Sequence, residues 1–415
     1  MLAYDRFELS NGLRVLVHRE PRNPIVSFNL LYDVGSRDEH PSRTGFAHLF
    51  EHLMFGGSVN VPNFDGPLEK VGGQNNAFTS NDITNYYITV PRGNIETAFW
   101  LESDRMLELD FSERSLEVQK NVVVEEFNQQ YLNQPYGDVW LHLCPLAYKV
   151  HPYRWPTIGM SPQHILDATL SDVKGFFYNH YAPNNAILSV VGDISTAEVE
   201  GLANKWFGPI ASRHVPPRNL PREPMQTEHR ELTLKRDVPY HSIYMVYHMC
   251  SKTHADFRTT DLISDILSNG KSSRLYQRLV KELRQFSSVN AYITGDIDEG
   301  LLVITGRLID GVSFDVARAS IEGIIEDVAS TLIEPKELDK VKNRFEANNT
   351  FDRSSPLDKA MKLGYYELLG NANLYNMVLP RYQAITPDDV RRVASDIFRQ
   401  TNRSILYYEA KSAKT

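Results

Sequence analysis

The sequence predicts an α+β protein made of two similar halves, each a mainly antiparallel sheet covered by helices. Apolar runs of strand length alternate with longer segments of helical periodicity, and the four clearest runs are residues 26–33, 84–90, 241–248 and 300–307. A helix followed by a strand also recurs near the end of each half. One pair opens at Asp172 and leads to residues 186–191, and the other opens at Asp389 and leads to residues 404–408. The offsets differ by one residue, which indicates a diverged internal repeat.

A proline-rich segment divides the two halves. Residues 214–227 read HVPPRNLPREPMQT and contain four prolines, which interrupt helices and cannot occupy central strands. We therefore predict a first domain over residues 1–213, a linker over residues 214–231 and a second domain over residues 232–415.

Length and composition are those of a globular protein. The chain has 415 residues, 42% of them hydrophobic, which is enough for two domains of about 200 residues each. No apolar run reaches the roughly 18 residues that a membrane span needs. The first residues, MLAYDRFELSNG, show no basic segment followed by an apolar one, so no secretory signal is visible. We expect a soluble protein of the cytoplasm or the periplasm.

Charge and cysteine content exclude two classes of protein. The formal net charge of −8 argues against nucleic-acid binding, which normally needs a basic surface. Cys144 and Cys250 lie far apart in the sequence and in different predicted domains. They are therefore expected to be free thiols and not part of a disulfide framework.

Residues 44–57, TGFAHLFEHLMFGG, predict an amphipathic helix. Thr44 is expected to cap its start, and Gly56 and Gly57 are expected to end it. Helical spacing places one set of large side chains in a single apolar stripe that should face the core, namely Phe46, Leu49, Phe50, Leu53 and Met54.

The opposite side of this helix carries an H-x-x-E-H run, formed by His48, Glu51 and His52. A spacing of four residues puts both imidazoles on one face, where they can bind a single ion, and neutral imidazoles suit zinc. A carboxylate beside them is placed to take a proton from water. We therefore predict a zinc site with two histidine ligands and Glu51 as the general base.

A catalytic zinc site needs a third protein ligand, and a second predicted helix offers two candidates. Residues 112–134 read SERSLEVQKNVVVEEFNQQYLNQ, and Pro135 follows them. Glu126 shares a helical face with Gln119 and Gln130, so its carboxylate can point toward the histidines. Glu125 lies about 100° round the helix. Spacing alone does not choose between the two glutamates.

Several segments, in their order along the chain, resemble the M16 zinc metallopeptidases, also called pitrilysin-like peptidases or inverzincins. They are VGSRDE at 34–39, TGFAHLFEHLMFGG at 44–57, GGQNNAFTSNDITNYY at 72–87, VVVEEF at 122–127, HPYRWPTIG at 151–159 and YAPNNAILSVVGD at 181–193. The resemblance is to the short-chain branch, which includes the mitochondrial processing peptidase β subunit and bacterial two-subunit relatives. It implies the duplicated fold, one zinc ion per chain and a closed chamber around the substrate.

The resemblance also implies roles for particular residues. In the family pattern the third ligand is the second glutamate of the pair, here Glu126. The position seven residues earlier is usually an acidic second-shell residue, but this chain has Gln119 there. That departure argues against the family's charge relay behind the metal.

Residues 76–79, Asn-Ala-Phe-Thr, correspond in the family to an edge strand to which an extended substrate adds as a further strand. Main-chain hydrogen bonds would then supply affinity, and pockets for alternate side chains would supply preference. The resemblance therefore implies substrate contacts at Asn76, Ala77 and Phe78, with Asn76 holding the substrate backbone near the metal.

Family peptidases carry an arginine and, seven residues later, a tyrosine in the second domain, where the pair stabilises the oxyanion. The corresponding positions here are Leu279 or Val280 and Phe286 or Ser287, so the pair looks absent. Arg284 and Tyr292 are possible substitutes. A missing pair predicts that the chain works as half of a dimer. We favour a heterodimer with a related chain that lacks H-x-x-E-H over a homodimer.

The predicted function is a zinc-dependent endopeptidase that hydrolyses peptides or unfolded polypeptide segments, with Glu51 as the general base on zinc-bound water. One alternative is a non-catalytic scaffold subunit of the same fold. Another is a module that binds a peptide or a metal without turnover. A scaffold has no need of all four site residues, His48, Glu51, His52 and Glu126, so their presence favours the peptidase.

Overall fold

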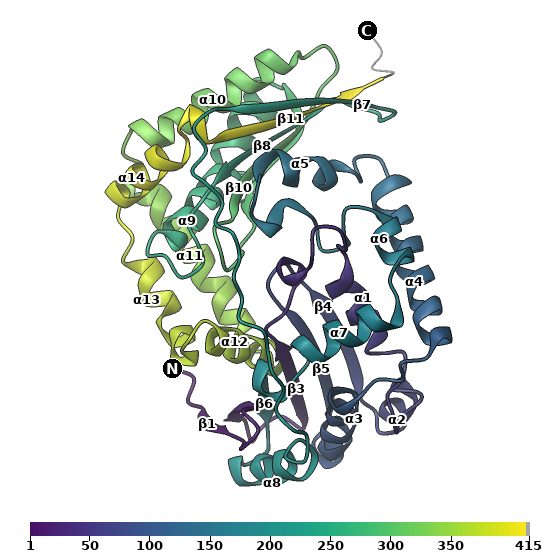
Figure 1. The fold of residues 1–415 in the computed structure, drawn as a ribbon. Coiled ribbons are helices and arrows are strands. Elements are labelled where there is room, and N and C mark those ends of the chain that lie inside the picture. The colour runs from purple at the N-terminus through teal and green to yellow at the C-terminus, as the bar shows by residue number, and fades with distance from the viewer. Residues whose placement is uncertain (412–415) are drawn as a thin grey trace. The chain divides into compact units, whose positions relative to one another are not determined.

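The protein forms two compact units in a computed structural model that describes residues 1–411 (Figure 1). Unit 1 consists of Met1–Gln129, Trp155–Leu220 and Thr350–Met377. Unit 2 consists of Gln130–Arg154, Pro221–Asn349 and the described chain from Val378 onward. Each unit is an α+β layer structure, as the sequence predicts.

The sheet of unit 1 has the strand order β1-β2-β6-β3-β5-β4. Only β2 and β6 run parallel, and the other neighbours are antiparallel. The strands are β1 (Asp5–Glu8), β2 (Arg14–Arg19), β3 (Ile25–Tyr32), β4 (Gln74–Thr79), β5 (Thr84–Pro91) and β6 (Ala186–Gly192). Strand β6 is buried along its whole length, so the core of the unit lies on both sides of it.

The sheet of unit 2 has the order β7-β11-β8-β10-β9, in which only β7 and β11 run parallel. Its strands are β7 (Arg230–Arg236), β8 (Ser242–His248), β9 (Phe286–Ile293), β10 (Leu301–Leu308) and β11 (Arg403–Ala410). This order repeats that of unit 1 without β1. The internal repeat expected from the sequence is therefore confirmed by topology.

Helices cover both sheets. Those of unit 1 are α1 (Phe46–Leu53), α2 (Asp65–Lys70), α3 (Ile95–Leu107), α4 (Glu113–Phe127), α6 (Pro162–Leu166), α7 (Leu170–His180), α8 (Thr196–Trp206) and α12 (Pro356–Leu368). Those of unit 2 are α5 (Val139–Ala147), α9 (Phe257–Ser268), α10 (Phe314–Ser330), most of α11 (Pro335–Asp352), α13 (Val378–Gln383) and α14 (Pro387–Ile397). Within residues 1–411, no helix combines the length and the apolar composition that crossing a bilayer requires. Both cysteines are free thiols, as predicted.

Each unit takes one helical segment from the other half of the sequence. Helix α12 packs on β3 and β6 of unit 1, where Ala360 and Leu363 join an apolar cluster with Ile187 (Figure 1). The approach is close, because a Cβ on Gly364 would lie 3.1 Å from the Ser189 hydroxyl. Helix α5 packs in turn against β7, β8 and β11 of unit 2.

The second predicted helix ends earlier than its sequence suggests. It was expected to run through residue 134, but the α-helical geometry of α4 ends at Phe127. The chain then forms a π-helical turn over Asn128–Leu132. Pro135 disfavours α geometry in the residue before it, and Tyr136 takes a left-handed conformation at φ 65°. The chain passes from unit 1 to unit 2 in this turn, after Gln129.

Candidate metal centre

Helix α1 is held by the apolar stripe that its sequence predicts. Phe46, Leu49, Phe50, Leu53 and Met54 are all buried. The Phe50 ring lies 5.1 Å from that of Tyr181, which follows α7 directly. Burying large side chains of this kind contributes about 1.5–3 kcal/mol each, so the stripe fixes which face of α1 points outward.

The start of α1 is capped differently from the prediction. The N-cap residue is Gly45, which takes a left-handed conformation at φ 90° and has no side chain to offer. The carboxylate of Glu39 instead accepts hydrogen bonds from the backbone N–H groups of Gly45 (2.9 Å) and Ala47 (2.8 Å). The prediction that Thr44 caps the helix was wrong, because the Thr44 hydroxyl instead accepts a hydrogen bond from the backbone N–H of Met160 at 2.8 Å.

Three side chains of unit 1 converge on the polar face of α1. The Nε2 atoms of His48 and His52 lie 3.6 Å and 3.3 Å from the Glu126 Oε2 atom. The two imidazole rings are 4.8 Å apart and almost perpendicular. One potential ligand atom from each residue lies within 4.8 Å of the others. No other such group of three histidine, cysteine or acidic side chains occurs among residues 1–411.

The two glutamates of α4 point in different directions. Glu126 is partly buried beside the histidines. Glu125 is exposed and accepts a hydrogen bond from the Gln129 side chain at 3.0 Å. The geometry therefore brings Glu126, and not Glu125, to the histidine pair.

The electrostatics of this group suit a cation. Burial lowers the pKa of His48 to about 4, even though the nearby Glu126 carboxylate raises it and His52 lowers it further. His48 is therefore neutral near pH 7 and available as a ligand. Imidazole nitrogens and carboxylate oxygens that direct lone pairs at one another repel, unless a proton or a metal ion lies among them. The donor set of two imidazoles and one carboxylate is one that zinc prefers.

Glu51 is held beside the group by β4. The Thr79 hydroxyl donates a hydrogen bond of 2.6 Å to Glu51 Oε2. Burial raises the pKa of Glu51, and the Thr79 hydrogen bond opposes that shift. A carboxyl with a raised pKa and a fixed orientation is a suitable proton acceptor for a reaction near neutral pH.

Strand β4, which carries Asn76, Ala77 and Phe78, is an edge strand of the unit 1 sheet. Its residues alternate between exposed and partly buried, and it contacts α1. The backbone N–H of Ala77 donates to the Asn76 side-chain oxygen at 2.8 Å. The Phe78 side chain is exposed. An extended chain could accept the Ala77 N–H only after the Asn76 side chain releases it, and substrate pairing at this edge stays a prediction.

Gln119 lies on α4 near the end of α1. Its Nε2 atom is 3.7 Å from the position that a Cβ would occupy at Gly56. Within the described residues the buried Nδ1 atom of His48 has no hydrogen-bond partner. A second-shell role for Gln119 stays a prediction.

Arg284 and Tyr292 belong to unit 2. Arg284 follows a π-helical segment, Tyr276–Glu282, and has a left-handed backbone at φ 51°. Tyr292 is near the end of β9, and both side chains are exposed. The aligned Leu279 and Phe286 are fully buried apolar side chains. An oxyanion role for Arg284 and Tyr292 stays a prediction.

Two polar residues that support α1 and Glu51 were not identified from the sequence as doing so. Glu39 lies in the VGSRDE block, but a carboxylate six residues before the N-cap has no recognised capping pattern. Thr79 was expected only on the substrate-binding strand. Their contacts depend on how the loop after β3 and the strand β4 approach α1.

Comparisons with known proteins agree with the fold. Residues 14–159 match the family model described as insulinase (peptidase family M16), and residues 167–345 match that described as the peptidase M16 inactive domain. The zinc protease PqqE of Helicobacter pylori is 29% identical over 97% of this chain and 92% of its own length.

Solved structures share the fold. A protease from Helicobacter pylori superposes with a TM-score of 0.94 at 28% identity, over 99% of this chain and all of that one. The periplasmic protease PqqL from Escherichia coli shares the fold, with a TM-score of 0.79 at 18% identity. That alignment covers 98% of this chain but 47% of PqqL. Because M16 family models match residues 14–159 and residues 167–345, the chain belongs to peptidase family M16.

Proposed function

We propose that this chain is a zinc-dependent endopeptidase that cleaves peptides or unfolded polypeptide segments. The observation that carries the proposal is the convergence of two imidazole nitrogens and the Glu126 carboxylate beside Glu51. The relative PqqE is named a zinc protease, which supports the same reaction class.

In this proposal His48, His52 and Glu126 hold the zinc ion. Zinc, when bound, would lower the pKa of water and polarise the scissile carbonyl. Glu51 accepts the proton of the attacking water and later returns it to the leaving amine. Thr79 keeps the Glu51 carboxylate oriented through its 2.6 Å hydrogen bond.

The substrate would bind as an additional strand on β4, through Asn76, Ala77 and Phe78. Edge pairing supplies main-chain hydrogen bonds without demanding a particular sequence. An extended segment is needed for this, which favours peptides and unfolded chains over folded proteins.

Replacing Ala77 with proline is expected to lower kcat/KM for peptides by roughly tenfold, because it removes a backbone donor worth about 0.5–1.5 kcal/mol and disfavours continued pairing. Zinc content should not change. The matched control is Ala77→Ser, which keeps the backbone donor. Equal activity of the proline and serine variants would exclude β4 as the substrate strand.

We also propose that the chain works beside a related chain that lacks H-x-x-E-H and supplies the arginine and tyrosine. The chain spans about half of PqqL, so one PqqL chain has room for two such parts. A homodimer, by contrast, would contain two zinc sites and no such pair. Addition of the second chain should raise the rate without changing zinc content.

Two other functions remain open to the same test. A scaffold subunit would bind no zinc, and a binding module would bind zinc or peptide without cleaving it. Zinc content of the purified chain and cleavage of a quenched peptide library, with and without a related partner chain, separate the three. Stoichiometric zinc with peptide cleavage supports the endopeptidase, and zinc without cleavage in either sample contradicts it.

A further inference from the structure

The loop between β3 and α1 sets the position of the metal-binding helix. The first N–H groups of a helix have no partner within the helix. Helix α1 has eight residues, so these groups are a large fraction of its backbone donors. The buried Glu39 carboxylate at the end of this loop satisfies those of Gly45 and Ala47. His48 follows Ala47 directly. A displacement of Glu39 would therefore move or fray the turn that carries the first histidine.

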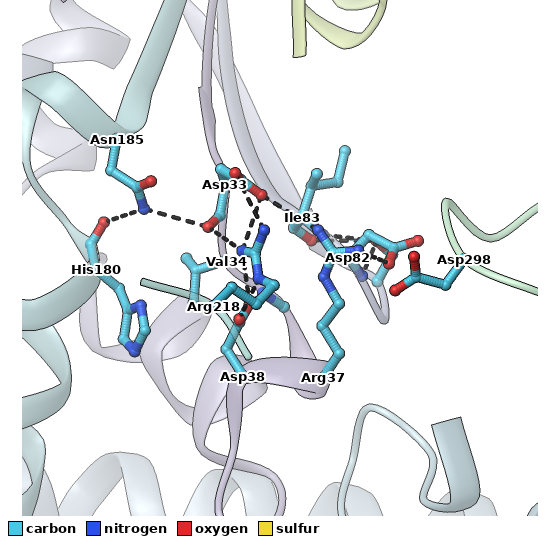
Figure 2. A network of polar contacts seen from close by, with 12 residues as sticks. Asp33, Val34, Arg37, Asp38, Asp82, Ile83, His180, Asn185, Arg218 and Asp298 are labelled. Atoms are coloured by element: carbon cyan, nitrogen blue, oxygen red, sulfur yellow. Dashed lines mark hydrogen bonds and ion pairs between the residues drawn. The ribbon is translucent and has the colours of Figure 1, made fainter. Parts of the chain in front are cut away.

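The same loop is held by Arg218, a residue of the proline-rich segment. Its guanidinium donates to Asp38 at 2.7 Å and 3.2 Å, and to the Asp33 carboxylate at 3.0 Å and 3.3 Å. It also donates to the Asp33 carbonyl oxygen at 2.9 Å. Figure 2 shows Arg218 between these two aspartates. The aspartates and Arg37 belong to the loop, whereas Arg218 reaches it from the proline-rich segment. Asp38 immediately precedes Glu39.

Charge makes this contact important for the loop. Arg37 is buried and forms ion pairs with Asp33 at 3.3 Å and Asp82 at 2.8 Å (Figure 2). Without Arg218, the Asp33 carboxylate would keep its ion pair with Arg37, which also pairs with Asp82. Asp38, whose side chain is 6% exposed, would lose both of its charged hydrogen bonds. Asp38 would keep the hydrogen bond from the Gly35 backbone N–H at 3.0 Å but would have lost its charged partner. Leaving a poorly solvated carboxylate without a charged partner is costly, so the loop would shift toward solvent.

The contact reaches the loop from a distant part of the sequence. Arg218 follows Pro216 and Pro217, which restrict the backbone, in a stretch without helix or strand. Trp155 also anchors the loop, since its indole N–H donates to the Ser36 carbonyl oxygen at 2.9 Å. Loss of Arg218 alone should therefore loosen the loop without unfolding the unit.

We propose that Arg218 is a positioning residue for the metal centre: by fixing Asp33 and Asp38, it holds Glu39 as the cap of α1 and thereby keeps His48 and His52 in binding geometry. The inference rests on the proposed zinc function. It assigns to the proline-rich segment a part in metal binding, in addition to connecting the two halves of the sequence.

The test compares Arg218→Gln, Arg218→Lys and a control, Arg222→Gln, which changes an exposed arginine of the same segment. Loss of a supporting contact outside the ligand set typically weakens metal binding by about 10–100-fold, and we expect about tenfold weaker zinc binding for Arg218→Gln. Lysine keeps the charge but cannot span two carboxylates, so Arg218→Lys should recover part of the affinity. Zinc dissociation constants are measured by competition with a chelator.

Hydrogen exchange of the metal-free protein gives a second readout that does not depend on zinc or turnover. Faster exchange of the Gly45 and Ala47 amides in Arg218→Gln, but not in Arg222→Gln, would support the proposal. Exchange and zinc affinity equal to those of the parent would overturn it, as would the same losses in Arg222→Gln. If the parent binds no zinc, the proposed function fails, and the exchange measurement still decides whether Arg218 holds the cap.

Discussion

Replacing Glu51 with glutamine is expected to lower kcat for peptide cleavage by a factor of about 10²–10⁴, the usual contribution of a general base. Glutamine has nearly the same shape and can still accept the 2.6 Å hydrogen bond from Thr79 through its amide oxygen. It cannot accept a proton from water. Zinc content and thermal stability should therefore stay close to those of the parent.

The measurement is the turnover of a quenched peptide together with the zinc content of the same sample. The control is Glu125→Gln, which makes the same substitution at an exposed residue of α4. Parental turnover in Glu51→Gln would refute the general-base assignment. Loss of zinc in that variant would instead make Glu51 a ligand.

The sequence predicted the polar face of α1 correctly because the H-x-x-E-H residues and the apolar stripe lie on one helix, so burial of the stripe fixes the direction of the opposite face. Phe50 and Leu53 are buried, so His48, Glu51 and His52 can only face the other way. The cap could not be predicted in the same manner. Glu39 reaches α1 because the chain after β3 turns back, and that turn depends on Arg218 and Trp155 from remote parts of the sequence.

The choice between the two glutamates depends on which face of α4 is buried. Its buried residues include Val123 and Phe127, which define the inner face. Glu125 is about 200° from Val123 and faces away, whereas Glu126 is about 60° from it. Once the burial of Val123 and Phe127 is known, helical geometry places Glu126 and not Glu125 near the inner face. The exposed Val118 and Val122 show why the sequence alone leaves the choice open.

No local sequence pattern predicts that α12 belongs to unit 1 and α5 to unit 2, each in the unit formed mainly by the other half of the sequence. Helices α5 and α12 each bury apolar side chains, and an apolar face by itself does not specify which sheet it covers. The close approach at Gly364 and the packing of Leu363 decide where α12 lies. These are contacts between residues more than a hundred positions apart in the sequence, which patterns of period two or 3.6 do not encode.

The second large expected effect is the loss of zinc when Glu126 is replaced with alanine. Zinc held by four protein ligands binds with about 10–16 kcal/mol, so one ligand contributes on the order of 3 kcal/mol. The dissociation constant should rise about a hundredfold or more, and His52→Ala should behave in the same way. Glu125→Ala should bind zinc as tightly as the parent, because Glu125 is exposed and contacts Gln129 instead of the histidines.

Chelator competition and metal analysis on the purified variants measure these effects, and circular dichroism shows whether each variant is folded. The paired design makes the comparison sharp, since the two glutamates are neighbours on one helix and lose the same chemical group. Normal zinc binding by Glu126→Ala together with loss of zinc in Glu125→Ala would reverse the ligand assignment. Normal binding by both variants would mean that the histidine pair holds zinc with a ligand from outside α4. The 3.3 Å and 3.6 Å approaches of Glu126 to the two imidazoles would then reflect a proton and not a metal ion between them.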